Sequence, residues 1–419
     1  MATIDKSLPN IDPNKLGEEI DIEEIQEAEV IDTPDGPVEI DMTEDGGAEV
    51  AFDPNAKEVP EGMDHFDNLA EGLDKQVSGS LASELMEKYK DYKQSRQEWV
   101  ESYREGLNLL GFKYVTRTEP FRGASSVTHP VLAEAVTQFQ AQAYKELLPA
   151  DGPVRTQILG TLSVEKEEQS KRVKDFMNYQ IMDKMKEYEP EFDQMLFYLP
   201  LSGSTFKKVY YDDLLGRAVS KFVPAEDLVV PYSATSLEDA EAIIHVLRIS
   251  QNDLRKQQIN GFYRDIDLGE PPVQEDKLKQ KELELEGIQQ NGTEDMYTIL
   301  EMHVNLDLEG FEDVNPEDNE PTGVRLPYIV TIDEATSEIL SIRRNFEEQD
   351  PLKNKKDYFV HFKFLPGLGF YGLGLIHMIG GLSRTATVAL RQLLDAGTLA
   401  NLPAGFKTRG VRMRDDAQP

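Results

Sequence analysis

The spacing of the apolar residues changes twice along the chain, and this change limits the folds that the chain can adopt. Apolar residues recur every three or four positions in residues 78–200, which is typical of amphipathic helices. Residues 205–249 and 296–364 alternate apolar with polar side chains, as strands do, and residues 375–394 return to the helical spacing. This order of helices, strands and one further helix predicts an α+β fold rather than alternating β-α-β units.

Several helix ends are marked by specific residues. Residues 78–110 read as one long helix that Gly111 ends, and residues 131–148 read as another. Ser163 and Ser250 each precede a further helix, because a serine side chain can accept hydrogen bonds from the free N–H groups of a first helical turn.

Residues 1–77 differ from the rest of the chain in composition. The chain has a formal net charge of −34, and its first 75 residues contain 23 acidic and only 4 basic side chains. Such a segment has too little apolar surface to offset the entropy lost on ordering. Residues 1–77 are therefore predicted to form a disordered acidic arm, which either keeps the protein soluble or docks on a basic partner.

Composition and motif content exclude several kinds of site. The acidic balance argues against tight, sequence-reading contact with DNA, which needs a basic surface. Cysteine is absent, so disulfides, zinc–thiolate sites and thiol catalysis are excluded. The six histidines lack the spacing of a helical metal site, and no hydrolase, Walker or zinc-protease motif occurs. We therefore expect no catalytic residue, metal ligand or bound cofactor.

Three glycines spell a G-x-G-x-x-G sequence just after a strand-like run, namely Gly367, Gly369 and Gly372. In dinucleotide-binding folds this turn lets the backbone approach a pyrophosphate at a helix N-terminus. Here Pro366 interrupts the junction, and Asp395 lies within the following helix instead of at the tip of a second strand. Close backbone packing is the favoured interpretation, and a nucleotide-binding enzyme is the alternative.

Residues 364–382 are long enough to cross a bilayer and carry no formal charge unless His377 is protonated. They also contain six glycines and Pro366, which favour a buried passage into a helix. We expect no membrane span.

The helix expected after the glycines has two different sides. Its apolar side carries Leu375, Ile379, Leu382, Ala386, Ala389, Leu390 and Leu393. Its polar side carries Ser383, Arg384, Thr387, Arg391 and Asp395. The helix is either an ordinary half-buried one or part of a ring of subunits. In a ring the apolar side would meet neighbours, and Arg384, Thr387, Arg391 and Asp395 would face a solvent-filled channel.

A basic cluster follows near the C-terminus. Lys407 and Arg409 share one side of an extended strand, and Arg412 and Arg414 share the other. The cluster is either a solvated strand or a surface for an acidic or phosphate-bearing partner.

Three stretches resemble portal proteins of short-tailed bacteriophages, and they occur in the order associated with that family. They are PFRGASSVTHPVLAEAVTQFQAQAYKELLP (120–149), YLPLSGSTFKKVYYDDLLGRAVSKFVPAEDLVVPYSATSLEDAEAIIHV (198–246) and HFKFLPGLGFYGLGLIHMIGGLSRTATVALRQLLDAGTLANLPAGFK (361–407). The likeness rests on structural segments and not on catalytic motifs.

The resemblance implies a structural protein and not an enzyme. Portal proteins form a dodecameric ring at one capsid vertex, through which double-stranded DNA passes non-specifically during packaging and ejection. By analogy, residues 78–372 would form a wing, residues 373–402 a channel-lining stem helix, and residues 403–419 the start of a clip. Lys407, Arg409, Arg412 and Arg414 would then lie near the rim that the terminase large subunit, and later the head-to-tail adaptor, contacts.

The implied location is the virion, with the host cytoplasm during assembly, and the implied further partners are the major capsid and scaffolding proteins. Portal chains continue with the rest of the clip, a second stem helix and a crown, so this chain is expected to be truncated within its clip. A different capsid-associated or scaffolding protein is a further alternative.

Overall fold

The computed structural model divides into two units, residues 1–61 and residues 62–419. It describes the backbone of residues 29–33, 36–42 and 48–50 in the first unit. In the second unit it describes residues 64–113, 117–212, 215–271, 277–288, 296–314 and 321–401.

The first unit contains a three-stranded antiparallel sheet of order β1-β2-β3. Its strands are β1 (Glu29–Thr33), β2 (Gly36–Met42) and β3 (Ala48–Val50). This sheet departs from the predicted disordered arm of residues 1–77. In β2, Val38, Ile40 and Met42 alternate with acidic residues, so the period of a strand is present despite the high charge.

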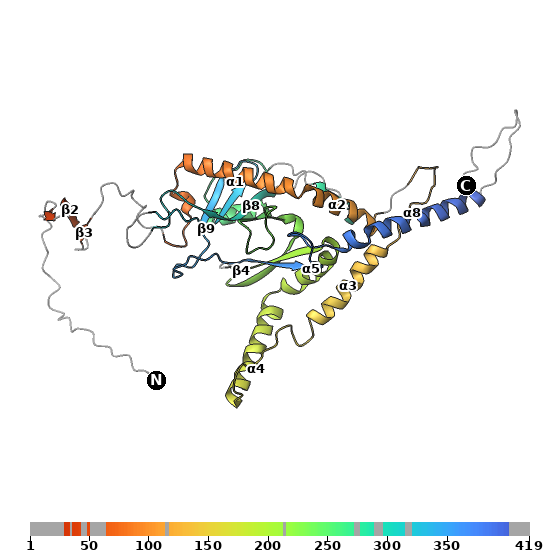
Figure 1. Ribbon diagram of the computed structural model, residues 1–419, viewed down its shortest axis with the longest axis horizontal. Helices are drawn as coiled ribbons and strands as arrows, with labels where there is room; N and C mark the ends of the chain where they lie inside the picture. Colours follow the sequence, from red (N-terminus) through yellow and green to blue (C-terminus); the bar gives the residue numbers. More distant parts are fainter. Residues whose placement is uncertain are drawn as a thin grey trace. The chain divides into compact units, whose positions relative to one another are not determined.

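The second unit is an α+β fold (Figure 1). Its α-helices are α1 (Lys75–Ser95), α2 (Gln97–Leu107), α3 (Val131–Leu147), α4 (Val164–Tyr179), α5 (Tyr188–Ser202), α6 (Gln251–Ile259), α7 (Lys277–Glu286) and α8 (Leu375–Asn401). Its short helical turns are η1 (Leu69–Glu71), η2 (Asn108–Leu110), η3 (Gln180–Lys184) and η4 (Ala225–Asp227). Its strands are β4 (Ser204–Asp212), β5 (Arg217–Pro224), β6 (Leu228–Val229), β7 (Ala242–Ser250), β8 (Met296–Leu306), β9 (Leu326–Asp333), β10 (Ile339–Arg344) and β11 (Phe359–Lys363).

These strands form two antiparallel sheets, of order β10-β9-β8-β7-β6 and β11-β4-β5. All strand pairs of the described residues are antiparallel, which is the arrangement of an α+β fold and not of a doubly wound dinucleotide-binding domain.

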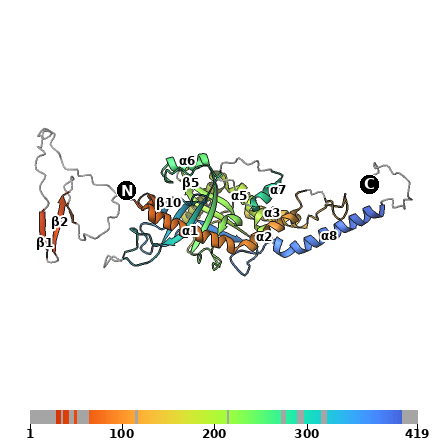
Figure 2. The same cartoon turned by 90° about the horizontal axis from the view of Figure 1, so that it is seen from above.

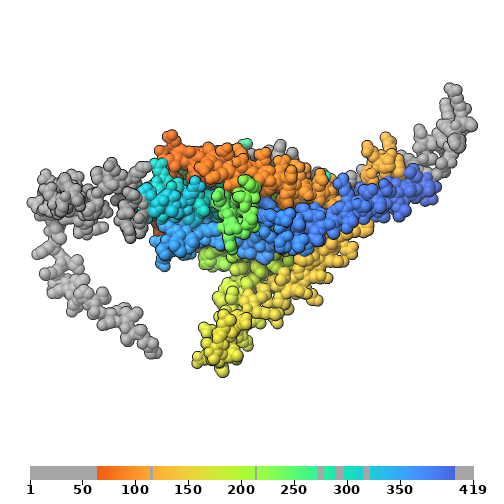
Figure 3. All heavy atoms as spheres, in the orientation of Figure 1, coloured from red at the N-terminus to blue at the C-terminus, as the bar shows by residue number. Residues whose placement is uncertain are grey.

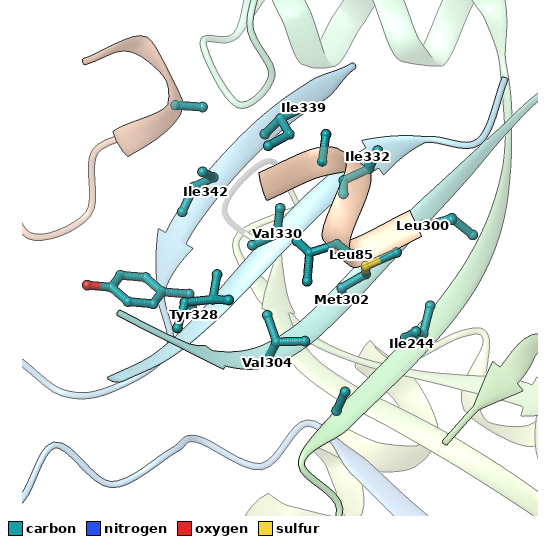
Figure 4. Close-up of a cluster of buried hydrophobic side chains, with 14 of the residues drawn as sticks. Leu85, Ile244, Leu300, Met302, Val304, Tyr328, Val330, Ile332, Ile339 and Ile342 are labelled. Carbon is teal, nitrogen blue, oxygen red and sulfur yellow. The ribbon is translucent and has the colours of Figure 1, made fainter. Parts of the chain in front are cut away.

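The main core lies between α1 and the five-stranded sheet (Figure 4). Leu85 of α1 faces Leu300, Met302 and Val330 of the sheet, and all four side chains are buried. Leu69 and Ala70 belong to the same core. The folded unit therefore begins before residue 78, and the predicted arm of residues 1–77 is too long at its C-terminal end.

The single long helix predicted for residues 78–110 is interrupted at Arg96. The guanidinium group of Arg96 is buried and donates hydrogen bonds of 2.8 Å to the carbonyl oxygens of both Ala225 and Leu228. It also donates to the hydroxyl of Tyr371 at 3.1 Å. Arg96 has a non-helical backbone, with φ of −100° and ψ of 8°, and is both the C-cap of α1 and the N-cap of α2.

Local signals set the ends of several helices as expected. Gly111 ends the helical segment in the left-handed conformation, with φ of 72°. The Ser163 hydroxyl accepts a hydrogen bond from Lys166 N–H at 3.4 Å, and the Ser250 hydroxyl accepts one from Asp253 N–H at 3.2 Å. Both serines are the N-caps of the helices that follow them.

Candidate functional site: the C-terminal helix and its exposed face

The helix α8 extends away from the two sheets, beside α2 and α3 (Figures 1 and 2). Its first turn enters a buried cluster, in which Ile376 packs against Tyr103 and Leu132. Gly106 of α2 lies at the crossing point, because a β-carbon there would collide with the Ile376 side chain. Only the first part of α8 is held by apolar packing of this kind.

Further along, α8 is held by three polar residues spaced one helical turn apart, which we call the polar row: Thr387, Arg391 and Asp395. All three bind the loop of residues 125–129. Asp395 Oδ1 accepts a hydrogen bond from the Ser125 N–H at 2.6 Å. Thr387 Oγ1 accepts one from the His129 N–H at 3.1 Å.

Arg391 lies between the other two residues of the polar row and binds the same loop. Its Nε donates to the Val127 carbonyl oxygen at 2.7 Å, and its Nη2 donates to the Thr128 hydroxyl at 3.2 Å. The polar row therefore satisfies backbone groups of the loop that would otherwise lie against an apolar helix.

The predicted channel-facing residues thus divide into two groups. Thr387 is 5% exposed, and Arg391 and Asp395 are half-buried against the loop, so the loop covers part of each side chain within one chain. That these residues face a channel stays a prediction. Arg384 is exposed. The basic residues Lys407, Arg409, Arg412 and Arg414 lie outside the described residues.

Figure 3 shows α8, in blue, along the surface of the second unit. The side of α8 opposite the polar row is apolar and exposed. Leu382 is 70% exposed, Leu393 is 71% exposed and Met378 is 53% exposed. Together with Ala389, these residues form what we call the apolar stripe. Ala389 is two positions from Thr387 and therefore lies about 200° around the helix from it. The helix turns polar residues towards its own chain and apolar residues away from it.

The glycine segment before α8 packs directly against backbone. A β-carbon on Gly372 would lie less than 3.0 Å from the carbonyl oxygens of Gly203 and Leu365, and one on Gly374 would meet Leu201 and Gly203 in the same way. Gly372 N–H also donates to the Ser204 hydroxyl at 2.7 Å. The Gly372 N–H is thus already hydrogen-bonded within the chain, and both glycines lie directly against backbone. This is the close packing that was expected for these glycines.

Gly369 differs from its neighbours in the motif. A β-carbon added to Gly369 would meet no atom within 4 Å. The G-x-G-x-x-G sequence therefore does not act as one unit, and β11, the strand before it, pairs antiparallel with β4. This is not the strand–turn–helix arrangement that holds a pyrophosphate.

A charge cluster with little solvent exposure joins the two sheets of the second unit. Lys208 Nζ on β4 donates to both carboxylate oxygens of Glu301 on β8, at 2.6 and 2.5 Å. His303 Nε2 lies 2.8 Å from Glu301 Oε1, and His245 is paired with Glu301 in the sheet register. Burial by itself raises the pKa of Glu301, but Lys208 and His303 outweigh it and hold that pKa well below its usual range. The cluster is a structural link between the sheets.

The described residues offer little support for other kinds of site. In that part of the chain, no group of three or more histidine, aspartate and glutamate side chains is arranged to hold a metal ion. Searched over the same residues, no helix combines the length and the hydropathy that crossing a bilayer requires.

Comparison with known proteins adds no relative: no protein-family model matches the chain, and no curated protein matches it.

Sequence reasoning missed the loop of residues 125–129 as the partner of α8. The signal was present, because Arg391 and Asp395 are rare charges in a helix of 27 residues that is otherwise almost uncharged. A charge retained in such a helix commonly has a specific partner.

Proposed function

We propose that this chain is a structural, non-catalytic subunit of a bacteriophage portal ring. In this proposal twelve copies surround a channel at one capsid vertex, and double-stranded DNA passes through it during packaging and ejection. The chain acts within the virion, and in the host cytoplasm during assembly.

The observation that carries the proposal is the exposed apolar stripe of α8. An apolar stripe that runs along about four helical turns gains free energy when a partner covers it, because each buried apolar Å² contributes about 25 cal/mol. The opposite side of the helix is already occupied by the loop of residues 125–129. An apolar stripe on the side that the chain leaves free is typical of a helix that neighbouring subunits cover.

The size of the stripe favours a closed ring over a simple pair. The apolar stripe runs from Met378 to Leu393, which is about 24 Å of helix, and at a width of about 10 Å it offers roughly 240 Å². Specific interfaces bury about 800 Å² per partner. A single contact through the stripe would therefore be weak, whereas a closed ring gives every copy two neighbours.

A second observation supports the family assignment. The three stretches that resemble portal proteins, residues 120–149, 198–246 and 361–407, are far apart in the sequence but pack together. The first contacts the third through the polar row, and Gly203 of the second contacts Gly374 of the third. β4 also pairs with β11. A likeness spread over three separate stretches is thus a likeness to one continuous part of the fold.

The acidic balance suits a channel for DNA. With a net charge of −34, the chain offers few phosphate contacts, and each such contact would add salt-dependent affinity and slow the passage of DNA. The terminase large subunit and the head-to-tail adaptor would dock at residues 403–419, where the basic cluster lies. The major capsid and scaffolding proteins would contact the wing, residues 78–372 by analogy.

Negative-stain electron microscopy and mass photometry of the purified protein test this proposal. We expect rings with a central hole and a mass that is a multiple of the 47.4 kDa chain. The paired substitution Leu382→Glu and Leu393→Glu should abolish the rings without reducing thermal stability, because both side chains are exposed.

Tyr232→Glu provides the matched control, since Tyr232 is an apolar-surface residue with 86% exposure outside α8. That variant should assemble like the wild type. A wild-type protein that stays monomeric under assembly conditions, or a doubly substituted stripe that still forms rings, would overturn the proposal.

A further inference from the structure

The helix α7 places a carboxylate in the middle of its buried side. It lies against α2 (Figure 2). Leu278 and Leu285 of α7 pack into the buried cluster that receives the first turn of α8. Glu282 stands between these two leucines, four positions from one and three from the other, so all three share one side of the helix. Glu282 is only 7% exposed, which is rare for a carboxylate that lacks full pairing.

A second carboxylate and a phenol lie in the same region. Glu282 Oε1, Glu226 Oε2 and the Tyr103 hydroxyl are buried and have no hydrogen-bond partner among the described residues. Tyr103 is fully buried on α2, and Glu226 belongs to the turn η4. Burial, followed by the charges of Glu226 and Glu282, raises the pKa of Tyr103, so the three groups form one cluster.

A shared proton supplies what this cluster lacks. Ionised carboxylates only accept hydrogen bonds, so two of them cannot satisfy each other, whereas a protonated carboxyl donates one. Two carboxylates that share a site away from water hold a proton between them, because their like charges repel. Burial, and then the charge of Glu282, raises the pKa of Glu226 well above its usual range. Burial also raises the pKa of Glu282.

The surrounding charges do not replace that proton. Arg96 donates to the backbone carbonyl oxygen of Glu226. Lys279 Nζ lies 3.3 Å from Glu282 Oε2 and lowers the pKa of both carboxyls, but burial outweighs it. The charged and titratable groups that face the two carboxyls are Arg96 at the α1–α2 junction, Tyr103 on α2, Tyr198 on α5, Asp227 on η4, and Lys279 and Glu286 on α7.

We propose that α7 is a proton-controlled strap: Glu226 and Glu282 hold a shared proton while α7 is docked, and release of that proton to solvent frees the helix. Detachment of α7 would uncover the cluster of Tyr103, Leu132 and Ile376, which fixes the start of α8. The inference concerns contacts within one chain, so it does not depend on the proposed ring.

The direction of the pH dependence follows from the raised pKa values. In the detached state both carboxyls have their ordinary pKa of about 4.3. The docked state keeps a proton that the detached state gives up, so docking is strongest in acid and weakens as the pH rises towards the raised pKa. His245 and His361 act in the opposite direction and below about pH 6.5, so the two effects can be separated.

Hydrogen exchange of the full chain between about pH 6.5 and about pH 9 tests the strap, after correction for the intrinsic pH dependence of exchange. A helix of ten residues is marginally stable alone, so detached α7 should exchange freely. Protection of its amides should fall about tenfold for each pH unit while the proton is being released. The surface helix α6 should keep its protection, which shows that the rest of the chain stays folded.

Substitutions identify the groups that titrate. The doubly substituted chain Glu226→Gln and Glu282→Gln keeps both shapes without an ionisable group, so α7 should stay protected across the whole range. Glu226→Gln alone should weaken the dependence, because Glu282 then faces no second carboxylate. Glu284→Gln is the matched control on the same helix, since this exposed carboxylate pairs with Lys113 and Lys281. It should keep the pH dependence of the wild type.

Each outcome decides the inference. A pH-dependent loss of α7 protection that disappears in the double variant and remains in Glu284→Gln supports the strap. Constant protection of wild-type α7, or a loss that persists in the double variant, overturns it. A loss that Glu284→Gln removes would assign the effect to the exposed ion pairs and would also overturn it. None of these results depends on whether rings form, so the proposed function is tested separately.

Discussion

Gly374 lies so close to Leu201 that a β-carbon on the glycine would collide with the Leu201 carbonyl oxygen. The same position would also collide with the backbone nitrogen of Gly203. The chain therefore crosses itself, backbone on backbone, immediately before α8 begins. This crossing explains the glycine-rich segment without a ligand.

Replacing Gly374 by alanine should destabilise the protein, because neither backbone segment at the crossing can move without disturbing α5 or β4. We expect a loss of about 1–3 kcal/mol in the free energy of unfolding, measured by urea denaturation. Gly369→Ala is the control from the same motif, since open space surrounds it. Equal losses in the two variants would show that the crossing does not govern stability.

Thr387→Val should loosen the loop of residues 125–129 from α8. The substitution keeps the side-chain shape but leaves the His129 N–H without its acceptor, which costs about 1–3 kcal/mol when the group is buried. Hydrogen exchange at His129 should accelerate. Thr385→Val is the control, because the exposed Thr385 hydroxyl donates only to the Gly381 carbonyl of its own helix. Unchanged exchange at His129 in the Thr387 variant would contradict this role.

Glu301→Gln should be among the most destabilising single substitutions of a charged residue. It removes the counter-charge of Lys208, whose side chain is only 14% exposed, and breaking one partner of a fully buried pair costs about 3–5 kcal/mol, which is the upper bound here. Adding Lys208→Met to the same chain should recover part of the loss in chemical denaturation. Lys256→Met is the control, because its pair with Asp253 is exposed and contributes little to stability. No recovery in the double variant would show that the pair is not the source of the effect.

Acid should destabilise the fold through His245 and His361. Burial lowers the pKa of each to about 3, and an unfolded histidine has a pKa of about 6.5. The unfolded state therefore takes up the protons first, so stability is present above about pH 6.5 and is lost as the pH falls towards about 3. Urea denaturation at several pH values in this window measures the slope.

The paired substitution His245→Gln and His361→Gln tests the origin of that slope. Whatever its stability at neutral pH, this variant should lose less stability than the wild type as the solution is acidified. A slope that matches the wild type would assign the acid sensitivity to other groups.

Local features of the fold could be predicted from short stretches of sequence. Ser163 and Ser250 cap helices because the bond each makes is to a residue three positions away. The hairpin of β4 and β5 follows from two alternating runs joined by a turn. In contrast, the break at Arg96 depends on carbonyl groups more than 125 residues away, and no local pattern contains them.

The sequence by itself determined the α+β class, the period of the elements in residues 78–249, 296–364 and 375–394, and the two unlike sides of α8, because these depend on residues within one or two turns of each other. Only the tertiary structure decided which side of α8 is covered. The loop of residues 125–129 satisfies its backbone N–H and carbonyl groups on Thr387, Arg391 and Asp395, and so it takes the polar side. The leucines are left exposed because hydrogen bonds to a distant loop, and not hydropathy alone, orient the helix.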